Sequence, residues 1–130
     1  MSLNILIVDD STVVRMSIIR ALKIAEIPLD NVFQAANGQE GLDVLEDNWI
    51  DMVLADINMP VMNGEEMIEK IRANPIWKEM PILVISTEGS KTRIERLKEK
   101  GAKFIHKPFP PETIREIICE MTGISHEQQV

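Results

Sequence analysis

The sequence predicts an α/β protein in which a doubly wound parallel sheet of five strands is covered by helices on both faces. Two observations predict this fold class. Short apolar runs alternate with helix-length amphipathic stretches along the whole chain. The three strongest runs, at residues 3–8, 52–55 and 82–85, are not broken into alternating polar and apolar positions. Strands of a parallel sheet covered on both faces have this pattern, and strict strand–helix alternation favours parallel pairing.

The first half of the chain contains two strand–helix units. The run at 3–8 leads into a helix whose apolar residues recur at helical spacing from Val14 to Ala25. Ser11 or Thr12 is a suitable N-cap for this helix, because a side-chain hydroxyl there can accept a backbone N–H of the first turn. A weaker strand candidate covers 32–36, and the second helix is marked by Gly41, Leu42 and Leu45.

A third unit follows in the middle of the chain. Its strand at 52–55 precedes a helix whose apolar residues are Met67, Ile68 and Ile71. This helix should end near Asn74, because Pro75 disfavours a helical conformation of the residue before it. Gly64 is expected to shape the loop that leads to this helix. Trp49 and Trp77 are expected to be packing residues near helix ends.

Two further units complete the chain. The strand at 82–85 precedes a helix from about Ser90 to Lys100, with Gly101 as its C-cap. A weaker strand covers 103–106, and the last helix begins after the prolines at 110 and 111. The lone cysteine, Cys119, is expected to be a small side chain of this last helix.

The fourth helix has an unusual composition. Only Ile94 and Leu97 are apolar between Ser90 and Lys100, and the segment has a net charge of +3. One interpretation is a solvated helix face, and the other is a docking surface on a lightly anchored helix. The basic residues are Lys91, Arg93, Arg96, Lys98 and Lys100.

Length and composition limit the possible functions. The 130 residues fit one domain, expected at 1–122, followed by a short polar tail at 123–130. The net charge of −7 argues against nucleic-acid binding, because an acidic chain repels phosphates. No apolar run approaches the roughly 18 residues that span a bilayer, and the N-terminus does not resemble a secretory signal. A single cysteine suits a reducing compartment, so a cytoplasmic location is expected.

Polar side chains occur where the predicted strands end. Asp9 and Asp10 follow the first strand, Asp56 follows the third, Ser86 the fourth and Lys107 the fifth. Ligands of open parallel sheets bind beyond the carboxyl ends of the strands, so these residues should converge. Each residue alone has a simpler explanation, since an acidic pair can cap a helix and a lone lysine commonly faces solvent.

Three carboxylates in one cleft repel one another unless they are protonated or share a cation. Hard oxygen ligands without nearby histidine or cysteine favour Mg²⁺ over zinc, with Mn²⁺ as an alternative ion. An aspartate beside such an ion can act as a nucleophile and form an aspartyl phosphate. The ion and Lys107 would then neutralise the charge of the transferred group.

Three segments resemble the receiver domains of bacterial response regulators. They are Ile5–Ser11 with Arg15 following, Asp56–Gly64, and Gly101–Phe109. The resemblance covers about residues 3–122 and is closest to the single-domain, CheY-like members. It implies a flavodoxin-like fold with strand order 2-1-3-4-5, an order for which CheY is a standard example.

The resemblance also implies roles for individual residues. Asp56 would be the phosphoacceptor, Asp10 a direct Mg²⁺ ligand, and Asp9 a ligand mainly through water. Asn58 would offer its backbone carbonyl to the ion, and Lys107 would pair with the phosphoryl group. Ser86 would bind a phosphoryl oxygen after activation, and Phe104 would turn inward as the aromatic switch. The side chains of Asn58 and Glu88 would flank the water that removes the phosphoryl group, and Thr87 could narrow access to Asp56.

We therefore expect a stand-alone response regulator that takes a phosphoryl group from a sensor histidine kinase. It would signal by docking a downstream protein on its fourth helix, fifth strand and fifth helix, as a monomer or a weak phosphorylation-dependent dimer. The expected docking residues are Lys91, Arg93, Arg96, Lys103 and Phe104.

Four alternatives remain open at this stage. The first is an intermediate protein of a phosphorelay. The second is an aspartate-dependent phosphatase, against which Asn58 argues, since such enzymes usually carry a second acid two residues after the nucleophile. The third is a flavodoxin-like or nucleotide-binding module, against which the absence of a glycine-rich phosphate loop argues. The fourth is a degenerate receiver used only for protein contacts.

Overall fold

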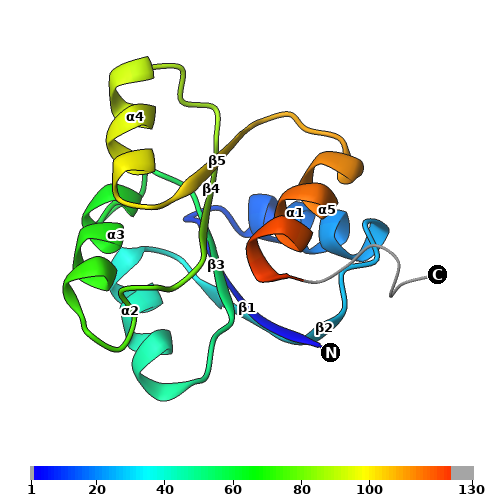
Figure 1. Cartoon of the computed structure of the whole chain (residues 1–130), viewed down its shortest axis with the longest axis horizontal. Coiled ribbons are helices and arrows are strands. Elements are labelled where there is room, and N and C mark those ends of the chain that lie inside the picture. Colours follow the sequence, from blue (N-terminus) through cyan, green and yellow to red (C-terminus); the bar gives the residue numbers. More distant parts are fainter. Residues whose placement is uncertain (1, 124–130) are drawn as a thin grey trace.

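The structure, a computed structural model, describes residues 2–123 and contains one five-stranded parallel sheet in the order β2-β1-β3-β4-β5 (Figure 1). The strands are β1 (Leu3–Val8), β2 (Leu29–Ala35), β3 (Met52–Ala55), β4 (Ile82–Ser86) and β5 (Lys103–His106). The helices that alternate with them are α1 (Thr12–Ile24), α2 (Gly38–Asp47), α3 (Gly64–Ala73), α4 (Lys91–Glu99) and α5 (Pro111–Thr122). The predicted fold class and strand order are confirmed. Residues 124–130 of the expected tail lie outside the described residues.

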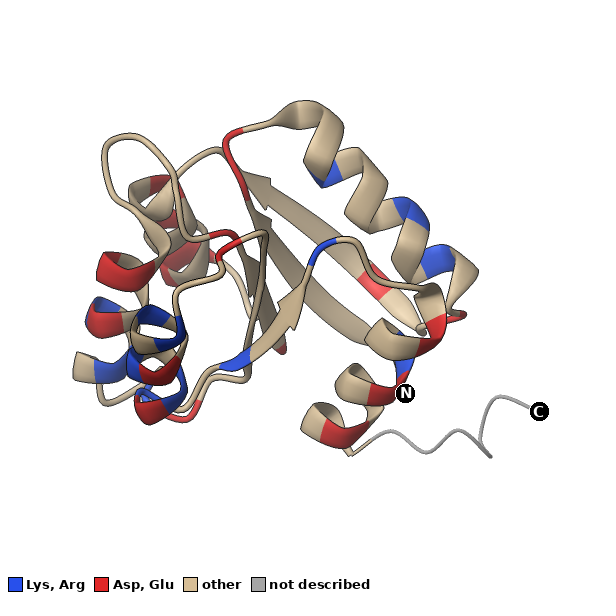
Figure 2. Cartoon of the chain, turned by 90° about the horizontal axis from the view of Figure 1, so that it is seen from above, with Lys and Arg blue, Asp and Glu red and all other residues tan. Residues whose placement is uncertain are grey.

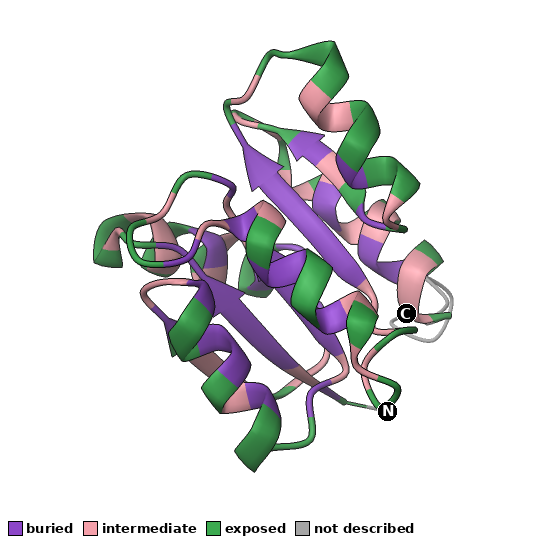
Figure 3. Ribbon diagram, turned by 90° about the vertical axis from the view of Figure 1, so that its left-hand side faces the viewer, coloured by how far each residue is buried: buried purple, intermediate pink, exposed green. Residues whose placement is uncertain are grey.

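The helices form two layers, with α1 and α5 on one side of the sheet and α2, α3 and α4 on the other (Figure 1). Successive strand residues point to opposite faces, so Leu6 and Val8 pack under α2 and α3 while Ile5 and Ile7 pack under α1 and α5. The central strands are therefore buried on both faces, as Figure 3 shows. This double burial is the reason that their sequences are apolar throughout. No helix among residues 2–123 is long and apolar enough to cross a membrane.

Three strand boundaries differ from the sequence prediction, one of them the end of β2 at Ala35 instead of the predicted 36. β2 begins at Leu29, three residues before the predicted start at 32. It is an edge strand with polar, exposed residues near its beginning, so this part lacks the apolar pattern from which the strand was predicted. A side chain of β1 supports this start, since Asn4 Oδ1 accepts the Asn31 backbone N–H at 3.2 Å. β4 extends one residue further than predicted, to Ser86, which pairs with His106 of β5.

Helix ends agree closely with the predicted caps. Ser11 rather than Thr12 is the N-cap of α1, and its Oγ accepts the Val14 N–H at 3.2 Å. α3 ends at Ala73, directly before Asn74 and Pro75. The C-cap of α4 is Lys100, one residue before the predicted Gly101, and Gly101 follows it with a φ of 81°, a left-handed conformation that glycine adopts without strain. Leu97 is the one buried residue of α4.

Candidate functional site

Three carboxylates meet at the carboxyl ends of the central strands. Asp9 and Asp10 follow β1 and Asp56 follows β3, and each offers an oxygen within 4.8 Å of those of the other two. Asp9 is 2% exposed, Asp56 is half-buried and Asp10 is exposed. The parallel strands thus bring together residues that are almost 50 positions apart in the sequence, as the strand-end pattern predicts.

Asp9 is hydrogen-bonded through its backbone and through only one of its two carboxylate oxygens. Its Oδ1 accepts the Ser11 backbone N–H at 2.9 Å, and its carbonyl oxygen accepts Arg15 Nη1 at 2.6 Å. Its other carboxylate oxygen, Oδ2, is buried and has no hydrogen-bond partner. The nearest cation is Lys107 Nζ at 3.8 Å, too far for a hydrogen bond. A buried anionic oxygen without a partner is costly, so this atom is poised to receive a cation.

Burial raises the pKa of Asp9, and the carboxylates of Asp56 and Asp10 raise it further, while the Ser11 N–H and the charge of Lys107 oppose the rise. The donor set consists of hard carboxylate oxygens, which suits Mg²⁺. The crowding of negative charge and the orphaned Oδ2 of Asp9 both fit a divalent cation at this position.

Asp56 occupies the centre of the site. Its Oδ1 accepts the N–H of the next residue, Ile57, at 2.8 Å, and its own N–H donates to the Val8 carbonyl at 3.0 Å. These bonds fix the backbone and one carboxylate oxygen, while the half-buried side chain remains open to solvent. Such an arrangement leaves a carboxylate oxygen available for reaction with a small substrate.

The other predicted site residues lie on β4 and β5 or directly after these strands. Ser86 is 1% exposed, and its Oγ accepts the Glu88 N–H at 3.1 Å. Lys107 follows β5, with its backbone N–H donating to the Ser86 carbonyl at 2.9 Å. Phe104 is half-buried on β5, next to Val84 in the strand register. Thr87 is exposed and lines a hollow with Lys107 and Phe109, on the side of the sheet covered by α1.

The expected docking surface on α4 is less positive than its sequence suggests. Glu65, in the first turn of α3, accepts two hydrogen bonds from Arg96, at 3.0 and 3.3 Å. It also lies 3.6 Å from Lys100 Nζ and 3.9 Å from Arg93 Nε. Figure 2 shows the basic and acidic segments of these helices gathered on one side of the molecule. The Arg96 guanidinium accordingly holds the pKa of Glu65 below its usual range.

The sequence reasoning missed this role of Glu65. Glu65 follows the N-cap Asn63 by two residues, so its place near a helix N-terminus was foreseeable. Its pairing with a helix about 30 residues later depends on the packing of α3 beside α4, which no local pattern reveals. The hydrogen bond by which Arg15 holds the Asp9 backbone is likewise not apparent from the sequence.

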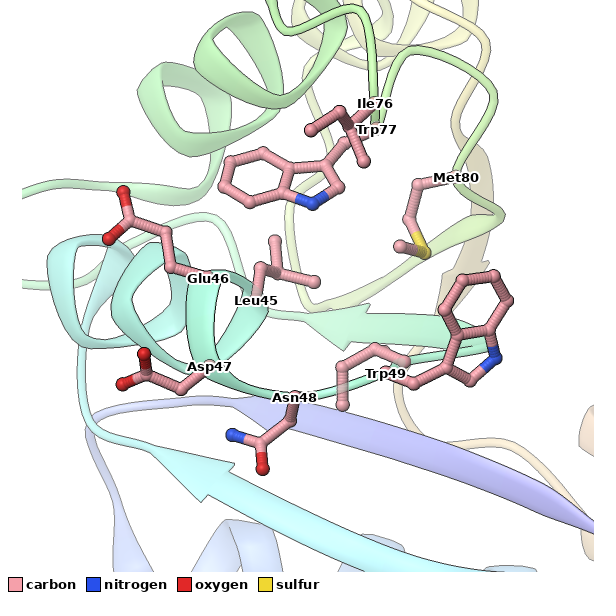
Figure 4. A pocket seen from close by; sticks show the side chains of 9 residues that line it. Leu45, Glu46, Asp47, Asn48, Trp49, Ile76, Trp77 and Met80 are labelled. Atoms are coloured by element: carbon pink, nitrogen blue, oxygen red, sulfur yellow. The ribbon is translucent and has the colours of Figure 1, made fainter.

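A separate hollow of about 320 Å³ lies near the opposite ends of the strands, between the end of α2 and the segment before β4 (Figure 4). Leu45, Trp77 and Met80 line it. The predicted packing role is correct for Trp77, which contacts the core, and wrong for Trp49, which is 77% exposed. Trp49 instead donates from its indole N–H to Asp51 Oδ1 at 3.1 Å. The hollow lies away from the three carboxylates and is not part of their site.

Mg²⁺ is expected to stabilise the fold, and Asp9→Asn is expected to weaken that effect. The folded-state pKa of Asp9 lies above the ordinary 3.8. The ion-free fold therefore loses stability as the pH rises from 3.8 through the folded-state pKa and Asp9 ionises, whereas below pH 3.8 the carboxyl is protonated and this penalty is absent. An ion at 100 times its Kd adds about 2.7 kcal/mol. Asp9→Asn should raise ion-free stability at pH 7, because it removes a buried charge that two further carboxylates repel.

Urea unfolding at pH 7 with EDTA and then with Mg²⁺ measures both effects. Asp47→Asn, a change at an exposed carboxylate on α2, is the matched control and should respond to Mg²⁺ like the unmodified chain. An equal Mg²⁺ response in Asp9→Asn would contradict the assignment.

Comparison with known proteins places this geometry in a family. The model of the response regulator receiver domain matches residues 5–119. Chemotaxis protein CheY1 of Helicobacter pylori is 38% identical over 123 aligned positions, and the match covers 93% of this chain and 98% of that protein.

Solved structures of similar fold support the same family. Chemotaxis protein CheY4 of Vibrio cholerae superposes with a TM-score of 0.81 at 33% identity, covering 93% of this chain and 99% of that one. CheY of Borrelia burgdorferi, solved in a complex with CheX, BeF₃ and Mg²⁺, gives a TM-score of 0.81 at 26% identity and covers 91% of this chain and 87% of that one. The chain therefore belongs to the family of response-regulator receiver domains.

Proposed function

We propose that the chain is a chemotaxis-type response regulator that accepts a phosphoryl group on Asp56 from the phosphohistidine of a sensor histidine kinase. The observation that carries this proposal is the half-buried Asp56 carboxylate within 4.8 Å of two further carboxylates, with Lys107 close to Asp9. The chemotaxis proteins among its relatives support the pathway.

In the proposed reaction, a carboxylate oxygen of Asp56 attacks the phosphorus of the donor. The phosphorus–nitrogen bond to the donor imidazole breaks, and the imidazole nitrogen leaves with the electron pair. Asp10, Asp56 and the Asn58 backbone carbonyl would hold Mg²⁺ or Mn²⁺ directly, and Asp9 mainly through water. The bound ion would neutralise charge on the transferred group. Lys107, which follows β5 two strands away from β3, would bind a phosphoryl oxygen through its ammonium group.

The response would pass through Ser86 and Phe104. Ser86 Oγ now accepts the Glu88 N–H, and its hydroxyl proton is available for a phosphoryl oxygen. Movement of Ser86 would vacate space for Phe104, which packs half-buried against the same strand. Such a change shifts an existing equilibrium between two conformations of α4, β5 and α5.

A downstream protein would dock on that surface, as the Borrelia relative was solved with CheX. The docking residues proposed are Lys91, Arg93, Arg96, Lys103 and Phe104. We place the chain in the cytoplasm, as a monomer or a weak phosphorylation-dependent dimer without nucleic-acid or membrane partners. It would catalyse only its own phosphorylation and dephosphorylation, and residues 1–122 would form the receiver domain. Transfer of the phosphoryl group onward to a relay protein is the alternative output.

Incubation with acetyl phosphate tests the proposal. The intact mass should increase by one phosphoryl group in the presence of Mg²⁺ and stay unchanged with EDTA, because three crowded anions repel a phosphodonor without the ion. Lack of any mass increase with Mg²⁺ would overturn the proposal. Retention of the full rate in EDTA would show that the carboxylates do not act through a cation.

Asn58 and Glu88 would set the rate at which the phosphoryl group is lost. Asn58 lies two residues after Asp56, and Glu88 two residues after Ser86, so the two side chains stand on the two loops that border the carboxylates. Their oxygens are hydrogen-bond acceptors that can orient a water molecule for attack. Thr87, between Ser86 and Glu88, would restrict the approach of that water.

A further inference from the structure

Arg93 of α4 links the two loops that border Asp56. Its Nη1 donates to Glu88 Oε1 at 3.0 Å, in the loop after β4. The same nitrogen lies 3.3 Å from Asn58 Oδ1, in the loop after β3. One guanidinium thus reaches side chains that are 30 residues apart in the sequence and that stand on either side of the carboxylates.

These contacts occupy the oxygens that the proposed hydrolysis needs. The two carboxylate oxygens of Glu88 are both engaged, since Oε2 accepts the Ser90 N–H at 3.1 Å and Oε1 accepts Arg93. The single acceptor oxygen of Asn58 also faces Arg93. A water molecule that donates to either residue must therefore use a remaining lone pair of an oxygen whose orientation the guanidinium fixes.

The position of Arg93 is fixed from two further directions. Its backbone N–H donates to the N-cap Ser90 at 3.3 Å, which places it in the first turn of α4. Its Nε lies 3.9 Å from Glu65 Oε1 on α3. With 25% of its side chain exposed, the guanidinium is enclosed by acidic and amide groups of three segments.

We propose that Arg93 is a positioning residue that slows loss of the phosphoryl group from Asp56 by holding the side chains of Asn58 and Glu88. This inference rests on the proposed function of Asp56. In hydrolysis, a water oxygen attacks phosphorus, the phosphorus–oxygen bond to Asp56 breaks, and the carboxylate leaves with the electron pair. The water protons remain with the phosphate product and solvent. Hydrolysis proceeds when Asn58 or Glu88 is released from Arg93 and can accept a hydrogen bond from this water.

The size of the effect follows from the exposure of the contacts. Partly exposed ion pairs are weak, so Arg93 holds its partners only part of the time. Arg93→Ala should therefore speed hydrolysis by about two- to fivefold, which is about 0.4–1 kcal/mol in the barrier. Arg93→Lys should give a smaller increase, because an ammonium keeps the charge but not the planar fork.

The experiment measures the lifetime of the phosphorylated protein after removal of acetyl phosphate. Lys98→Ala is the matched control, since Lys98 is an exposed cation of the same helix and makes no ion pair among residues 2–123. It should leave the lifetime unchanged. Urea unfolding of each variant separates a change in lifetime from a loss of stability.

Two further measurements separate positioning from a merely structural role. In an Asn58→Ala/Glu88→Ala background, whose lifetime should be longer, Arg93→Ala should have no further effect, because the groups it holds are gone. High salt should bring the lifetime of the unmodified protein closer to that of Arg93→Ala, because salt screens the ion pair.

An unchanged or longer lifetime in Arg93→Ala would overturn the inference while leaving the proposed function intact. Shortening that persists in the doubly substituted background would also overturn it. Absence of phosphorylation in the unmodified protein would remove the proposed function and this inference with it.

Discussion

Asp56→Asn is expected to abolish phosphorylation by acetyl phosphate. An amide has no carboxylate oxygen with which to attack phosphorus, and the roles proposed for the nearby Asp9 and Asp10 are those of cation ligands. The substitution preserves shape, and the asparagine oxygen can still accept the Ile57 N–H that Asp56 Oδ1 accepts at 2.8 Å. It also removes one of three mutually repelling charges, so the fold should be at least as stable.

Intact mass in the presence of Mg²⁺ measures the result. Asp30→Asn, a change at an exposed carboxylate of β2, is the matched control and should accept one phosphoryl group like the unmodified chain. The product should be an acyl phosphate, which hydroxylamine cleaves and a phosphoserine resists. A hydroxylamine-resistant product that persists in Asp56→Asn would instead assign the acceptor to a hydroxyl such as Ser86.

The carboxylate cluster could be predicted from sequence because a parallel sheet imposes a simple geometric rule. Each strand of such a sheet ends at the same edge, so the residue after each strand is placed by the fold alone. Asp9, Asp10 and Asp56 follow strands whose apolar runs are unambiguous, and the structure brings them within 4.8 Å. The prediction therefore needed only the strand boundaries and the direction of pairing.

Contacts between helices are not subject to such a rule. Glu65 and Arg96 meet because α3 and α4 lie side by side, and neither sequence position indicates the partner. The bridge from Arg93 to Asn58 and Glu88 likewise depends on the course of two loops. The start of β2 was missed for a different reason, since an edge strand with exposed residues lacks the apolar signal of the central strands.

The sequence indicates that Gly64 matters for the loop after Asp56, but it does not show why a glycine is needed there. It was expected to shape the loop after Asp56, and the structure places it as the first residue of α3, after the N-cap Asn63. It is buried, and its N–H donates to the Ile57 carbonyl at 2.8 Å. The helix therefore begins directly against the backbone that carries the phosphoacceptor candidate.

Gly64→Ala is expected to destabilise the fold by about 3 kcal/mol, at the upper end of the usual cost of overpacking. A Cβ at this position would collide with the Asp56 carbonyl oxygen and would lie 3.0 Å from Ile57 Cα. Both are backbone atoms, so no side-chain rotation relieves the clash. Either the start of α3 or the Asp56 segment must move.

Urea unfolding measures this loss, with Gly89→Ala as the matched control. A Cβ at Gly89 would meet nothing within 4 Å, so that variant should be neutral or more stable, by up to about 1 kcal/mol from reduced freedom of the unfolded chain. Equal stabilities of the two variants would contradict the close packing of α3 on Asp56. Since any shift of this backbone displaces Asp56 from Asp9 and Asp10, Gly64→Ala should also weaken the stabilisation by Mg²⁺, whereas Gly89→Ala should preserve it.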